Sequence, residues 1–132
     1  MAATPYELAR VAAIAADDKK ATDIVLLDLE NDSDVCEYFL IFSAPNTRLL
    51  DAIIDEIREK MKKALNIGPL SQEGRAGASW VLLDYGSLVV HGFLPATRDF
   101  YRLERLWGSA PRVDLGLEGQ APIEDMVPSV EG

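Results

Sequence analysis

Few residues in this chain have the types and spacing that chemistry requires, and His91 with Asp84 is the first such pair. His91 lies in the apolar run at residues 88–93, and Asp84 precedes it across a short turn. A catalytic histidine needs an acid or a nucleophile within hydrogen-bond reach, and Asp84 is the nearest candidate. The apolar neighbours favour the other interpretation, a packed histidine with one nitrogen satisfied. We therefore expect a structural role for His91.

A second pair, Asp28 and Glu30, lies at the end of a predicted strand. Strand alternation puts both carboxylates on one face, the arrangement with which magnesium-dependent transferases hold their metal ion. A phosphate-binding loop also needs glycines, so that backbone N–H groups can approach the anion, but the first glycine in the chain is Gly68. A residual magnesium-dependent nucleotidyltransferase is kept as the alternative function. With one histidine and one cysteine we expect no metal site, no cofactor and no catalytic residue.

The most informative local pattern is the strand that contains Trp80 and Asp84. Strand alternation puts Trp80, Leu82 and Asp84 on one face and Val81, Leu83 and Tyr85 on the other. A tryptophan is usually a core residue, yet it is also a preferred anchor of protein interfaces. A face that ends in an aspartate is not expected to be wholly buried. Trp80 with Asp84 is thus a candidate interface pair.

The charge balance indicates which kind of partner fits. The chain has 22 acidic and 13 basic residues, a formal net charge of -9 and a pI of about 4.5. This charge repels a phosphate backbone and attracts a basic protein surface, so we expect no direct nucleic-acid readout. Six acids without a base among them form either a solvated loop or an anionic edge for the partner: Asp23, Asp28, Glu30, Asp32, Asp34 and Glu37.

Hydrophobic periodicity places the elements that must position these residues. A first helix is predicted at about residues 5–19, after the capping-box spacing of Thr4 and Glu7. A second is predicted from residue 47, where residues 45–47 can cap it, to a stop at Gly68-Pro69, and a third at 98–107, with residues 95–97 as its cap. Strands are predicted at 24–27 and 38–43, and a hairpin at 80–84 and 88–93 has Gly86 in its turn. Residues 66–79 read as a loop. The result is an α+β fold, a mixed β-sheet of about four to five strands with three helices packed on it.

The chain is predicted to be one domain at residues 1–108, followed by a flexible acidic tail at 109–132. The tail has five acids and one base and no sustained period, and an adaptor that binds through it is a further alternative. The single cysteine, Cys36, and the absence of a signal-peptide pattern or a long apolar run predict a cytoplasmic protein without membrane contact.

Several motifs then become specific for a known family. Residues 80–86 (WVLLDYG), 89–91 (VVH) and 98–108 (RDFYRLERLWG), with 23–28 and 37–41 upstream, resemble the Iojap family, the ribosomal silencing factors RsfS. The likeness covers about residues 21–108, more weakly the first helix, and not the tail. Two positions depart from the family pattern: Ala44-Pro45 where Gly is usual, and Gly92 where a β-branched residue is common. We expect Pro45 to stiffen a turn and Gly92 to weaken a strand.

The resemblance implies a nucleotidyltransferase-like fold without the catalytic motifs, and no enzyme activity. It implies binding to a basic ribosomal protein on the intersubunit face of the large ribosomal subunit, which blocks subunit association and represses translation under nutrient limitation. It also implies a homodimer of the free protein. Together with the hairpin pattern, it gives these expected partner-binding residues: Trp80, Val81, Asp84, Tyr85, Arg105 and Trp107.

Overall fold

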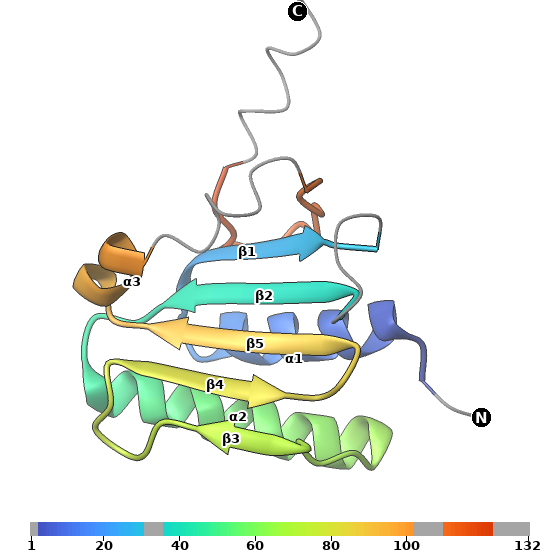
Figure 1. Cartoon of the computed structure of the whole chain (residues 1–132), viewed down its shortest axis with the longest axis horizontal. Helices are drawn as coiled ribbons and strands as arrows, with labels where there is room; N and C mark the ends of the chain where they lie inside the picture. Colours follow the sequence, from blue (N-terminus) through green and yellow to red (C-terminus); the bar gives the residue numbers. More distant parts are fainter. Residues whose placement is uncertain (1–2, 31–35, 102–109, 123–132) are drawn as a thin grey trace, which may run out of the picture.

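The computed structural model describes residues 3–30, 36–101 and 110–122 (Figure 1). Its elements in chain order are α1 (Pro5–Asp18), β1 (Thr22–Asp28), β2 (Tyr38–Ser43), α2 (Thr47–Leu65), β3 (Ser71–Glu73), β4 (Trp80–Asp84), β5 (Leu88–Phe93) and α3 (Pro95–Tyr101). The predicted α+β class is confirmed. Within the described residues, no helix is long and apolar enough to cross a membrane.

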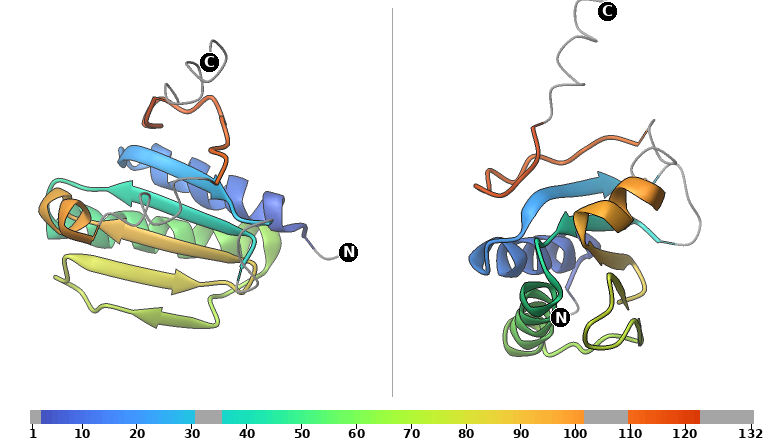
Figure 2. Two further views of the ribbon diagram at one scale, coloured as in Figure 1. Left: turned by 45° about the horizontal axis from the view of Figure 1, so that its top comes forward. Right: turned by 90° about the vertical axis from the view of Figure 1, so that its left-hand side faces the viewer.

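The five strands form one mixed sheet in the order β1-β2-β5-β4-β3. β2 and β5 are parallel neighbours, and the other three pairs are antiparallel. Helices α1 and α2 lie side by side and cover one face of this sheet (Figures 1 and 2). On the opposite face a second, smaller core cluster buries the side chains of the central strands, among them Ile41 and Phe93, and the partly exposed side chains lie mainly on β4.

Both long helices begin with side-chain caps that the sequence indicated. The Thr4 hydroxyl accepts from the backbone N–H of Glu7 at 3.1 Å, and the Glu7 carboxylate accepts from Thr4 N–H at 2.9 Å, a complete capping box ahead of α1. The Asn46 side chain accepts from the N–H of Leu49 at 2.8 Å at the start of α2. α2 ends at Leu65, where the predicted loop begins, because Asn66 adopts the left-handed conformation with φ of 57°.

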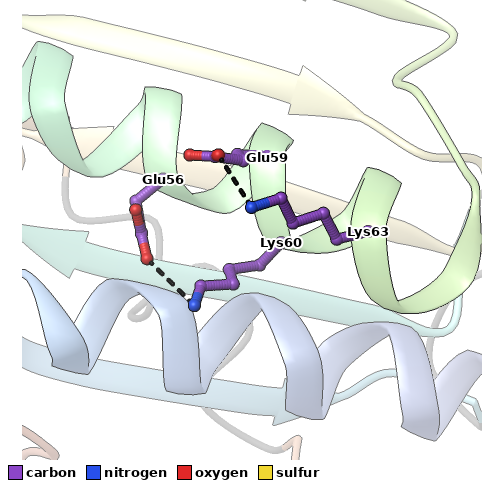
Figure 3. Close-up of polar contacts among 4 residues, drawn as sticks. All are labelled: Glu56, Glu59, Lys60 and Lys63. Atoms are coloured by element: carbon purple, nitrogen blue, oxygen red, sulfur yellow. Dashed lines mark ion pairs between the residues drawn. The ribbon is translucent and has the colours of Figure 1, made fainter.

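The last turns of α2 hold two ion pairs on the solvent side. Lys60 Nζ lies 3.5 Å from a Glu56 carboxylate oxygen, and Lys63 Nζ lies 3.3 Å from that of Glu59 (Figure 3). Both pairs have the i,i+4 spacing that stabilises helices by a few tenths of a kcal/mol. The lysine run is thus a solvated helix end, where positive charge also complements the helix dipole.

The main core fills the space between the sheet and the two helices. Its fully buried members include Leu26, Leu40, Phe42 and Leu50. Gly92 lies among them, and a Cβ there would be 2.7 Å from both the Leu50 Cδ1 and the Phe42 Cζ atoms. β5 keeps its register on both sides through Gly92, so this glycine permits close packing there. The expected weakening of the strand stays a prediction.

The largest differences from the predicted elements are at β3 and α3. Residues 71–73, predicted as loop, form the edge strand β3, whose three side chains are all exposed and so give no hydrophobic pattern. α3 begins at Pro95, three residues before the predicted Arg98, because proline takes the first helical position. Its predicted continuation at residues 102–107 lies outside the described residues.

The described part of the predicted tail, residues 110–122, lies along the outer edge of β1 and is named the C-terminal strap (Figure 1). Four backbone hydrogen bonds of 2.8–2.9 Å link it to Ile24, Leu26 and Asp28. Gly119 N–H also donates to Asp17 Oδ1 at 2.8 Å. This half of the segment therefore differs from the flexible chain that we expected, whereas residues 109 and 123–132 lie outside the described residues.

Candidate docking face

The sheet face opposite α1 and α2 is the candidate docking face, and the strand register fixes its rows of side chains. Across β4, β5 and β2, the first row is Trp80, Phe93 and Ser43 and the second is Leu82, His91 and Ile41. The third row is Asp84, Val89 and Phe39. In each row the β4 residue is half-buried, and of the β5 and β2 residues only Phe39 is.

The predicted alternation of β4 is confirmed. Trp80, Leu82 and Asp84 are half-buried, whereas Val81 and Leu83 are 1% and 0% exposed and pack toward the helices. Val81 was expected to bind the partner, but in this structure it supports the face from beneath and offers no surface. The inward direction follows from the strict period of two along a strand.

Trp80 belongs to an aromatic cluster that β5 and β2 complete. Its ring stacks on Phe93 with centroids 5.0 Å apart, and its indole N–H donates to His91 Nδ1 at 3.2 Å. Phe39 from β2 and His91 pack edge to face, with ring centroids 4.8 Å apart. Phe39 and Leu82 are half-buried members of the face that the predicted list omitted. Alternation already placed Leu82 there, but Phe39 required the β2–β5 register.

His91 is the packed histidine that the sequence favoured. It is 4% exposed, and burial lowers its pKa from the ordinary value near 6.5 to about 4. The imidazole is thus neutral at neutral pH. Its partner is Trp80, and no hydrogen bond to Asp84 is present among the described contacts, which gives no support to an acid-base pair.

Asp84 and Tyr85 shape the turn that ends the face. The Asp84 carboxylate accepts from the N–H of Gly86 at 2.8 Å, and Gly86 has the positive φ of 89° that the turn was predicted to need. Tyr85 is 6% exposed, on the helix side, and burial raises its pKa to about 12. Tyr85 was expected to bind the partner, but it is a core residue in this structure. Arg105 and Trp107 lie outside the described residues.

The acidic residues do not form one edge. Asp23 is exposed at the start of β1, whereas Asp28, Glu30 and Glu37 lie at the opposite end of the β1–β2 pair. Burial and then these three carboxylates raise the pKa of Tyr38. Asp32 and Asp34 are outside the described residues.

Asp84 extends the anionic end of the sheet from the hairpin side. The Cys36 pKa is raised to about 11, by burial first and then by the negative charge of Asp84, with Glu37 adding to it. Ser87 O accepts from Glu37 N–H at 2.8 Å, which ties the hairpin turn to the start of β2. The docking face therefore has an aromatic centre and an acidic end.

The residues considered for metal or phosphate chemistry are arranged differently. Asp28 Oδ1 accepts from the backbone N–H of Glu30 at 3.0 Å, a local turn contact. In the described ranges, no group of three His, Cys, Asp or Glu side chains is placed to hold a metal ion. A hollow of about 510 Å³ lies on the helix side, between the start of α1 and the end of α2, and its Glu7 is engaged in the capping box.

Comparison with known proteins places these features in a family. The family model described as "Ribosomal silencing factor during starvation" matches residues 2–128. The ribosomal silencing factor RsfS of Bacillus subtilis is 43% identical over 106 residues, which are 80% of this chain and 89% of that protein. A more distant relative from Mus musculus, named "Mitochondrial assembly of ribosomal large subunit protein 1", is 33% identical over 91 residues, 67% of this chain and 40% of that protein.

The fold gives the same result. A crystal structure of a protein from Chromobacterium violaceum matches with a TM-score of 0.77 and 29% identity, and the match covers 89% of this chain and 96% of that chain. The family match extends well past residue 108 and includes the C-terminal strap, which the sequence resemblance did not reach. The chain therefore belongs to the RsfS family of ribosomal silencing factors, whose names denote a regulatory role at the ribosome.

Proposed function

We propose that this protein binds the large ribosomal subunit through the candidate docking face, blocks subunit association and thereby represses translation under nutrient limitation. Family membership supports the ribosome as the target and starvation as the condition. The large subunit is supported by the printed name of the mouse relative. The observation that carries the proposal is the half-buried Trp80, which belongs to an aromatic cluster on the face opposite the helices.

The proposed partner is a basic ribosomal protein on the intersubunit face. The chain's net charge of -9 and the acidic end at Asp84, Asp28 and Glu37 complement such a surface. Electrostatic complementarity of this kind raises the association rate, and salt reduces it. We propose a cytoplasmic regulator without enzymatic activity, because the relatives are named as silencing factors, a regulatory role. The homodimer of the free protein stays a prediction, which sedimentation equilibrium tests.

The test is co-sedimentation with isolated large and small ribosomal subunits. Wild-type protein should pellet with large subunits only, and added small subunits should then fail to join them. Trp80→Ala should weaken binding at least about 30-fold, because a buried aromatic anchor at an interface contributes about 2 kcal/mol or more. Tyr6→Ala is the matched control, since Tyr6 is 41% exposed on α1, on the helix side.

The charge of Asp84 is tested with a variant that keeps the turn. Asp84→Asn retains an oxygen that can accept from Gly86 N–H but removes the negative charge. Asp55→Asn on exposed α2 makes the same change in net charge away from the face. Weaker binding and a smaller salt dependence in the Asp84 variant alone would support the acidic end. Equal effects of both variants would assign the attraction to net charge, and wild-type binding by folded Trp80→Ala would remove the docking face.

A truncation distinguishes docking through the sheet face from the adaptor alternative, in which the C-terminal residues bind the partner. Deleting residues 109–132 would also remove the strap from the edge of β1, so the deletion should begin at residue 123. We expect full large-subunit binding after this shorter deletion. Loss of binding would move the interface to the C-terminal residues.

A further inference from the structure

The orientation of the Trp80 indole depends on a residue in the neighbouring strand. Trp80 pairs with Phe93 and Leu82 pairs with His91, so Trp80 and His91 are diagonal neighbours on the docking face. Phe93 supports one side of the indole with centroids 5.0 Å apart, but stacking alone allows the ring to turn in its plane. The 3.2 Å hydrogen bond from the indole N–H to His91 Nδ1 sets that remaining direction.

Histidine is an unfavourable residue for this position unless it makes that bond. Nδ1 accepts from Trp80, so the neutral ring carries its proton on Nε2. Nε2 is buried and has no hydrogen-bond partner in the part of the chain that the structure describes. A buried donor without an acceptor destabilises the folded state, and an apolar side chain of similar size would avoid this. The polar contact found for the imidazole is the hydrogen bond with Trp80, which indicates that the role of His91 is to accept from the indole.

We propose that His91 is a positioning residue that holds the indole of Trp80 in a single orientation for docking. The proposal rests on the proposed function of the face. A ring that is already oriented loses less conformational freedom when the partner binds. The imidazole itself is buried among Trp80, Phe39 and Phe93 and does not meet the partner.

Three substitutions separate the hydrogen bond from the packing. His91→Asn places an amide oxygen where Nδ1 lies and keeps an acceptor for the indole. His91→Gln extends the amide one bond further, toward the Nε2 position, and His91→Leu removes both polar atoms. Each variant is first checked for folding by circular dichroism, and the Asn and Gln pair keeps the test usable if the Leu variant does not fold.

The first measurement is NMR of the free protein and needs no ribosome. In wild type, the imidazole ¹⁵N shifts should show the proton on Nε2, and the Trp80 indole N–H, assigned with Trp80→Phe, should exchange slowly with water. His91→Asn should keep slow exchange, whereas His91→Gln and His91→Leu should lose it. A proton on Nδ1, or an unchanged indole signal in folded His91→Gln or His91→Leu, would overturn the proposal.

The second measurement is the affinity for isolated large subunits. We expect His91→Gln and His91→Leu to bind roughly fivefold more weakly, the effect of one net hydrogen bond, and His91→Asn to bind as wild type does. Equal losses in the Asn and Gln variants would also overturn a positioning role. If wild-type protein itself does not bind large subunits, the proposed function fails, and the NMR comparison still decides whether His91 orients the indole.

Discussion

The stability of this protein should depend on pH through His91 alone across the range just below neutrality. It is the only histidine in the chain, and its pKa is about 4 in the folded protein against an ordinary value near 6.5 in the unfolded chain. Between these two pKa values the unfolded chain binds the proton and the folded protein does not. The free energy of unfolding therefore falls as pH decreases through this window, and the full contribution is present above the unfolded pKa.

The size of the effect follows from the two pKa values. The contribution of His91 to the free energy of unfolding should fall by about 2 kcal/mol from about pH 7.5 to about pH 5, and by about 3 kcal/mol once pH approaches the folded pKa. The conversion is suitable here because the imidazole is 4% exposed, so solvent screens it little. Protonation would put a charge in an aromatic cluster and remove the acceptor of the Trp80 indole.

Urea denaturation at these two pH values measures the difference directly. His91→Leu has no histidine, so subtracting its pH dependence from that of the wild type isolates the His91 contribution. The expected remainder is the loss of about 2 kcal/mol calculated above. The same free energy of unfolding at both pH values in wild type, or the same pH dependence in His91→Leu, would refute the reasoning.

Three further predictions concern packing, with Gly68→Ala as a common control because a Cβ there would meet no atom within 4 Å. Gly92→Ala should lower the free energy of unfolding by about 1–3 kcal/mol in urea denaturation, since its Cβ overlaps the core, and a loss equal to that of the control would contradict this. Gly119→Ala should displace the strap, because its Cβ would lie 2.4 Å from Ala21 O. The Ile24 amide donates to Gly119 O, so its hydrogen exchange should become faster, and unchanged exchange there would argue against the strap contact. Arg98→Met should lower the free energy of unfolding by about 1.5–3 kcal/mol in thermal or urea denaturation, since the buried guanidinium donates at 2.8 Å to both Asp23 O and Ser43 Oγ. An unchanged free energy of unfolding would show that these hydrogen bonds make no net contribution to stability.

The local elements of this protein could be read from its sequence. The hairpin has its predicted bounds and the predicted positive φ at Gly86, because turn chemistry acts over three or four residues. The caps at Thr4 and Asn46 and the direction of Trp80 were accessible for the same reason. Membership of the family was also visible in the motifs around this hairpin.

Other features depended on segments that lie far apart in the sequence. The edge strand β3 is fully exposed, so it has no hydrophobic period that a sequence could show. In the strap, Val113, Leu115 and Leu117 alternate and pack against the main core, but only the tertiary structure shows that its backbone bonds to the edge of β1. Phe39 contacts His91, and so joins the aromatic cluster, only because β2 and β5 are parallel neighbours in a particular register. The sequence by itself determined which face of β4 Trp80 takes, since alternation is local. Only the tertiary structure decided that His91 meets its indole, because that contact requires the pairing of two strands.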